Sequence, residues 1–221
     1  VEPILRNIQS IDWITLLLFG SLMLVVLAKS AFYNRFLNFI ILPFNNKYVF
    51  MYNKKEKLLN WFHIFFTVFQ VINFSLFIYL AFLVLFKDGS LLNMDSSYSY
   101  PFILGALLLF LLIKVLLQLS NGFIFNSNKV ISELIFKKLS YLNYGGLVMF
   151  AANLVLCYVL KDSQLVVYVA FFLILLINVI GWVTLLRNHQ NFLASNFFYF
   201  ILYLCALEIA PFVIIGSYLN D

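Results

Sequence analysis

The sequence predicts an all-α, polytopic membrane protein: a bundle of six transmembrane helices with amphipathic interfacial helices on the cytoplasmic side. Two observations lead to this prediction. Hydrophobic residues make up 64% of the chain and charged residues only 10%, which is too little polar surface for a soluble protein of 221 residues. Apolar stretches also recur along the chain, and about 18 apolar residues suffice for a membrane-spanning helix. We expect residues 1–221 to form a single integral membrane domain.

Six apolar stretches are expected to cross the membrane. The second is long enough to tilt or to extend beyond the bilayer. The short link KDSQ at 161–164 allows only a tight turn between antiparallel neighbours. The six spans cover approximately residues 13–28, 58–86, 101–120, 141–160, 165–186 and 197–218.

Basic residues are distributed unequally between the two sides of this bundle. Most of the 14 lysines and arginines follow the first, third or fifth span, whereas Asp88, Asp95 and Asp162 lie on the opposite side. Cytoplasmic loops carry the excess of Lys and Arg, so both termini are expected outside. Because basic residues flank apolar spans, the net charge of +5 indicates contact with anionic lipid head groups and no nucleic-acid partner.

Two of the longer inner segments have helical patterns. Residues 127–139 place Val130, Ile131, Leu134 and Ile135 on one face, which predicts an amphipathic helix lying on the inner membrane surface. Residues 32–42 look like a second, more aromatic helix that ends at Pro43. These helices either anchor the loops to lipid or form a cytoplasmic docking surface.

Two charged residues of opposite sign interrupt the apolar spans. Lys114 lies within the third span and Glu208 within the sixth. An ionisable group at mid-bilayer costs about 2.5–3.5 kcal/mol on insertion scales and usually finds a partner in the bundle interior. We therefore expect these two side chains to pair. Counting along each span at about 1.5 Å per residue puts Asn73 and Asn178 near the same depth, which predicts one intramembrane polar layer.

The polar layer has a structural and a functional interpretation. Polar residues can hydrogen-bond between helices, and an ion pair can determine which helices meet. Alternatively, the layer relays protons or ions or binds a polar ligand. Pro211 should bend the sixth helix beside Glu208, as a hinge or as a packing kink. Gly145 and Gly146 are interpreted as a helix-contact stripe, because small residues let helices approach closely.

Motifs for chemistry are lacking. The acidic residues are scattered, and His63 and His189 have no ligand-spaced neighbours, so neither a metal nor a cofactor is expected. Cys157 and Cys205 lie in apolar runs and are interpreted as small buried hydrophobic residues. The sequence favours a non-enzymatic role without deciding it.

Five stretches together resemble one protein family. They are SIDWITLLLF (10–19), KSAFYNRF (29–36), NKYVFMY (46–52), SYLNYGG (140–146) and NFFYFILYLCALEIAPF (196–212). The pattern resembles domain-of-unknown-function family 4271, and its last stretch, which contains Glu208, is the most specific. The resemblance implies a multi-pass protein of the bacterial inner (cytoplasmic) membrane. Combined with the orientation expected from the basic residues, this location makes both termini periplasmic. It implies no activity, so no catalytic residue is carried over.

Three functions remain open on the sequence. The first is a subunit or scaffold of a cell-envelope complex in secretion or envelope assembly, with an envelope protein or a second copy of the chain as partner. The second is a small transporter or proton-coupled unit that uses Lys114 and Glu208. The third is a membrane enzyme acting on lipid or a polyprenyl carrier, which would need inner-side polar residues to cluster. The candidates for that cluster are Arg35, Lys47, His63, Arg187 and His189.

Overall fold

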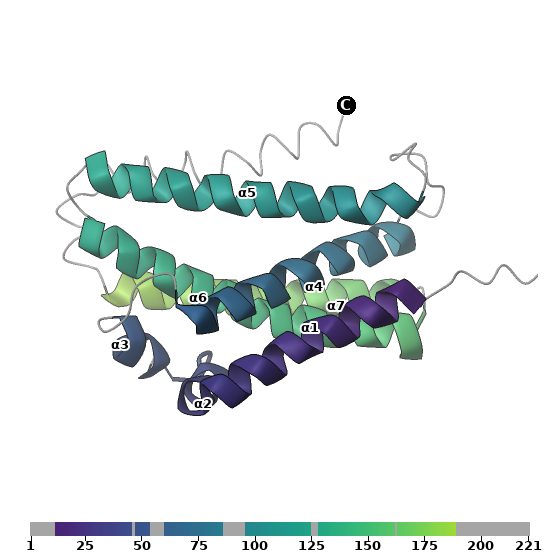
Figure 1. Cartoon of the computed structure of the whole chain (residues 1–221), viewed down its shortest axis with the longest axis horizontal. Helices are drawn as coiled ribbons and strands as arrows, with labels where there is room; N and C mark the ends of the chain where they lie inside the picture. The colour runs from purple at the N-terminus through teal and green to yellow at the C-terminus, as the bar shows by residue number, and fades with distance from the viewer. Residues whose placement is uncertain are drawn as a thin grey trace, which may run out of the picture.

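The computed structural model describes residues 12–45, 47–53, 60–85, 96–124, 128–161 and 163–188. All regular structure in these ranges is helical (Figure 1). The α-helices are α1 (Asp12–Ala31), α2 (Tyr33–Ile40), α3 (Lys47–Asn53), α4 (Trp61–Leu85), α5 (Ser96–Ile124), α6 (Asn128–Leu154) and α7 (Gln164–Asn188). A π-helical turn, η1 (Val155–Val159), extends α6.

Five of these helical segments are long and apolar enough to cross a membrane: Asp12–Ala31, Trp61–Leu85, Tyr98–Ser120, Ile131–Val159 and Gln164–Thr184. Each overlaps one of the first five predicted spans, so the chain is an integral membrane protein, and its described residues form a helical fold. The predicted sixth span at 197–218, with Glu208 and Pro211, lies outside the described residues.

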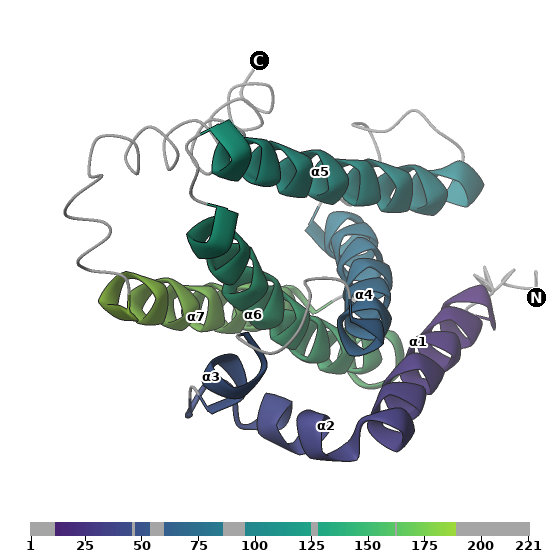
Figure 2. The same ribbon diagram turned by 60° about the vertical axis from the view of Figure 1, so that its left-hand side comes forward.

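Helix α4 lies at the centre of the described bundle. Figure 2 shows it between α1 and α6, with α5 alongside, and its most extensive contacts are with α6. Side chains on all sides of α4 are buried: Phe62, Phe66, Phe69 and Phe77 line one face, and Val71, Ser75 and Tyr79 lie on the opposite side. By contrast, α5 exposes most of its leucines and buries only a few residues near its two ends. An apolar exposed surface of this kind is stable in lipid, where it costs no hydration.

The prediction of a separate interfacial helix over 127–139 is wrong. Residues 128–154 form one uninterrupted helix, α6, and the fourth span therefore begins about ten residues earlier than expected. Leu134, Ile135 and Phe136 are buried against other helices and do not face the membrane surface. Ser140, where the sequence prediction separated the two helices, donates its hydroxyl to the Phe136 carbonyl at 2.7 Å within the helix.

The predicted aromatic helix near 32–42 is present as α2. Phe32 breaks the direction of the chain between α1 and α2, with φ of −136° and ψ of 52°. The turn that follows α2 includes Pro43 and leads to α3. Figures 1 and 2 place α2 and α3 at one end of the bundle, beside the first turns of α4 and α6.

Candidate functional site

A close approach of α4 and α6 sets the geometry of the bundle interior. At Gly146 an added Cβ would lie 3.0 Å from the Gln70 Cα, so only glycine fits there without a shift of backbone. Seven residues later on α6, Asn153 donates its side-chain amide to the Asn73 carbonyl on α4 at 3.0 Å. Gly145 faces Phe74 at an ordinary contact distance. The two glycines proposed as a contact stripe thus both lie against α4.

Three members of the predicted polar layer lie in the described helices. Asn73 is fully buried on α4 and donates its side-chain amide to the Phe69 carbonyl of its own helix. Asn178 is half-buried on α7 and likewise donates to the Ile174 carbonyl one turn earlier. Lys114 lies on α5 in a pocket. Because Glu208 lies outside the described residues, the layer and the Lys114–Glu208 pair stay predictions.

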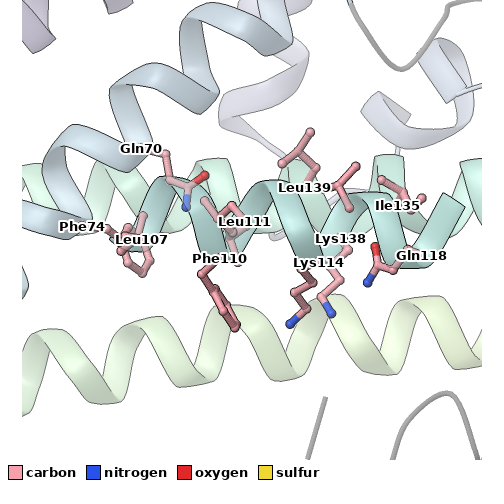
Figure 3. A pocket seen from close by; sticks show the side chains of 12 residues that line it. Gln70, Phe74, Leu107, Phe110, Leu111, Lys114, Gln118, Ile135, Lys138 and Leu139 are labelled. Carbon is pink, nitrogen blue, oxygen red and sulfur yellow. The ribbon is translucent and has the colours of Figure 1, made fainter. Parts of the chain in front are cut away.

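The pocket around Lys114 lies between α4, α5 and α6 and has a volume of about 230 Å³. Figure 3 shows the side chains of Lys114 from α5 and Lys138 from α6 next to one another, extending in the same direction. Gln70 and Gln118 are the other polar residues that line the pocket. Leucine, isoleucine, valine and phenylalanine side chains form the rest: Phe74, Leu107, Phe110, Leu111, Val115, Ile135, Leu139 and Leu142.

Two basic side chains meet in this pocket. The Lys114 and Lys138 amines lie close to one another, and within the described part of the chain the residues that line the pocket include no acidic side chain. Aromatic rings supply part of the stabilisation. The Lys114 Nζ lies 5.6 Å from the Phe110 ring centre, and the Lys138 Nζ lies 5.4 Å from that of Trp182 on α7.

A second polar cluster fixes α2 and α3 to the bundle. Arg35 is only 4% exposed, and its guanidinium carbon lies 4.9 Å from the ring centres of both Tyr52 and Phe62. Its Nε donates to the Tyr48 hydroxyl at 3.4 Å, and that hydroxyl lies 3.3 Å from the His63 Nε2. We call Arg35, Tyr48, Tyr52, Phe62 and His63 the arginine cluster.

The arginine cluster brings together two of the five residues that a lipid-modifying enzyme would need. Arg35 and His63 meet through Tyr48, whereas Lys47 is exposed on α3. The Arg187 side chain and His189 lie outside the described positions. Arg35 and His63 are both almost fully buried, so the arginine cluster resembles a packing core more than an accessible reaction site.

Sequence reasoning missed Lys138 and Gly181. The sequence pattern puts Lys138 on a surface helix and therefore does not predict its position beside Lys114. The position of Lys138 beside Lys114 follows only once residues 128–154 are known to form one continuous helix. Gly181 on α7 lies against the Tyr141 ring of α6, where an added Cβ would be 2.8 Å from the ring. Its contact resembles that of Gly146, but a lone glycine in an apolar run gave no reason to select it.

The sequence profile described as "Domain of unknown function (DUF4271)" matches residues 14–219. The chain belongs to the DUF4271 family. The resemblance predicted from the five sequence stretches is therefore confirmed. No curated protein and no solved structure matches this DUF4271 chain. The family description assigns no function, so any role for this DUF4271 protein has to be argued from its own residues.

Proposed function

We propose that this chain is a non-enzymatic inner-membrane protein that serves as a subunit or scaffold of a bacterial cell-envelope complex. The observation that supports the proposal is the way in which α2 is held. Arg35 and Phe39 are buried on one side of α2, and Phe39 packs with its ring centre 4.6 Å from that of Phe66 on α4. The same helix exposes Tyr33, Leu37 and Ile40.

The exposed residues of this segment form what we call the α2 face. Phe44, which is 89% exposed, extends it beyond the helix, and Ile41 is also exposed. Because the arginine cluster anchors α2 from within, the α2 face is held in one orientation before a partner arrives. Preorganised side chains lose less conformational entropy on binding, which favours a specific protein partner over a general contact with lipid.

Site-specific photocrosslinking tests the proposal. A photoreactive phenylalanine analogue replaces Leu37 or Phe44, and the variants are irradiated in native membranes. We expect both positions to give the same discrete protein adduct, whose identity names the complex. The matched control is Leu109, which is also exposed but lies on α5. Lipid adducts alone at Leu37, Phe44 and Leu109 would contradict a docking role for the α2 face.

A second candidate function, a small transporter or proton-coupled unit, is favoured by the pocket around Lys114. In this case Glu208 is the mobile or titrating partner of Lys114. Glu208→Gln should then abolish transport without changing protein abundance. The double variant Lys114→Leu with Glu208→Leu distinguishes a relay from a structural pair. If this variant folds and functions normally, a relay is excluded. If the pair is structural, either single change should destabilise more than the double change.

A further inference from the structure

The exposed residues of the α2 face recur with a helical spacing. Tyr33, Leu37 and Ile40 follow one another at intervals of four and three residues, and Phe44 comes four residues later. The turn after α2 is itself hydrogen-bonded, since the Phe44 amide donates to the Ile41 carbonyl at 3.0 Å. We call Tyr33, Leu37, Ile40 and Phe44 the α2 stripe. Intervals of three and four residues are those by which one helix packs along another.

Two exposed lysines flank the α2 stripe. Lys29, in the last turn of α1, lies four residues before Tyr33, and Lys47, the first residue of α3, lies three residues after Phe44. Figure 2 shows α2 between the end of α1 and α3. The Lys47 amide N–H donates to the Asn45 side chain at 3.0 Å, which fixes the start of α3 directly after the α2 stripe. One lysine therefore lies near each end of the α2 stripe.

The segment that carries the α2 stripe has no acidic residue. Residues 13–53 contain Lys29, Arg35 and Lys47 but no aspartate or glutamate. Arg35 is buried in the arginine cluster, whereas Lys29 and Lys47 are exposed and form no ion pair among the interactions of the described residues. An apolar stripe with an exposed cation near each end is complementary to a partner that is apolar in its middle and acidic on both sides.

We propose that the α2 face binds an acidic amphipathic helix of a partner protein, with apolar side chains on the α2 stripe and carboxylates against Lys29 and Lys47. The inference rests on the docking role proposed above and adds the chemistry of the partner. From Tyr33 to Ile40 the α2 stripe is about 10 Å long, so the carboxylates are expected at least about seven residues apart on the partner helix. The fixed orientation of α2 favours a helix over anionic lipid, because lipid adapts equally well to a mobile segment.

The sequence of the crosslinked partner segment tests the proposal. The photoreactive analogue at Leu37 is irradiated in native membranes, and the attached peptide is identified by mass spectrometry. We expect a segment with more aspartate and glutamate than lysine and arginine, and with apolar residues at intervals of three and four. A discrete protein adduct through a neutral or basic segment overturns this proposal but leaves the docking role intact. No protein adduct at Leu37 or at Phe44 removes the docking role, and this proposal with it.

Two lysine variants test the contribution of charge. Lys29→Gln combined with Lys47→Gln should lower the yield of the Leu37 adduct at least about fivefold, because two exposed ion pairs are lost. Lys29→Arg combined with Lys47→Arg keeps both charges and should leave the yield within about twofold of wild type. The matched control is Lys161→Glu, which changes the net charge equally at the opposite end of the described bundle and should leave the yield unchanged. An unchanged yield in the glutamine variant overturns the pairing with carboxylates.

Anionic lipid provides the remaining arm of the experiment. If lipid phosphates met Lys29 and Lys47, irradiation at Leu37 would give lipid adducts in place of a discrete protein adduct. The yield of those lipid adducts would fall in the glutamine variant and persist in the arginine variant. That outcome overturns the proposal and the docking role together.

Discussion

The closest backbone approach among the described glycines occurs at Gly146. An added methyl group there would meet the Gln70 Cα at 3.0 Å and its Cβ at 3.1 Å, and neither backbone can move without its helix. Gly146→Ala should therefore lower the free energy of unfolding by about 1–3 kcal/mol, the usual range for an overpacked core. Thermal unfolding in detergent measures the effect.

Gly105 on α5 provides the matched control for Gly146. Nothing lies within 4 Å of a Cβ added at Gly105, so Gly105→Ala gains helix propensity at no steric cost. We expect it to be neutral or to stabilise by up to about 1 kcal/mol. Equal effects of the two substitutions would show that α4 and α6 are not in close contact at Gly146.

Asn153 makes the shorter of two described side-chain hydrogen bonds between α4 and α6, at 3.0 Å; in the other, the Thr67 hydroxyl donates to the Asn143 Oδ1 at 3.4 Å. The substitution Asn153→Ala removes the bond to Asn73 and leaves the buried backbone carbonyl of Asn73 with one hydrogen bond fewer. The expected cost is about 0.5–1.5 kcal/mol, as for interhelical hydrogen bonds in other membrane proteins. Asn178→Ala is the comparison, because the Asn178 amide bonds only within α7 among the interactions described and is half-buried. Unfolding by denaturant in mixed micelles should rank Asn153→Ala as the more damaging change.

At the level of elements, α2 depends on the planar side chain of Arg35. The guanidinium lies between the Tyr52 and Phe62 rings, and lysine offers neither the plane nor the directed Nε–H. Arg35→Lys keeps the charge but should cost about 2 kcal/mol, the value of a desolvated cation–π contact. It should also raise protease sensitivity at α2. Lys47→Gln, which changes an exposed residue of α3, should alter stability by less than about 0.5 kcal/mol. If α2 in Arg35→Lys is as resistant to protease as α2 in the wild-type protein, the arginine cluster does not hold this helix.

The elements that hydropathy could identify were predicted well, and those defined by tertiary packing were not. Five predicted spans correspond to apolar helices, because length and composition are sufficient to recognise a membrane helix. The boundary of α6 was missed because the amphipathic pattern over 127–139 is the same for a helix on lipid and for one whose apolar face packs on protein. Phe136 decides between the two: it is buried, with its ring 4.6 Å from that of His63.

On the scale of the whole molecule, the candidate site was only partly predictable. Lys114 is conspicuous in the sequence, since a charge in an apolar run is costly. Lys138 is not, because lysines are common in segments that border a membrane. Its position beside Lys114 depends on α5 and α6 being continuous and antiparallel, so that residues equally far from their connection face one another. To predict such a pair, one has to know how two helices are aligned along their length, and this alignment cannot be derived from composition.

The orientation of the whole bundle is the last prediction. Lys29 is exposed at the end of α1, and Lys161 is exposed in the turn before α7, at opposite ends of the described bundle (Figure 1). The positive-inside rule places Lys29 in the cytoplasm and Lys161 in the periplasm. In spheroplasts of a variant without native cysteines, a membrane-impermeant maleimide should label Lys161→Cys at once. Lys29→Cys should react only after the membrane is opened. The reverse pattern would invert the topology, and equal labelling of both positions before permeabilisation would contradict a membrane barrier between the two ends.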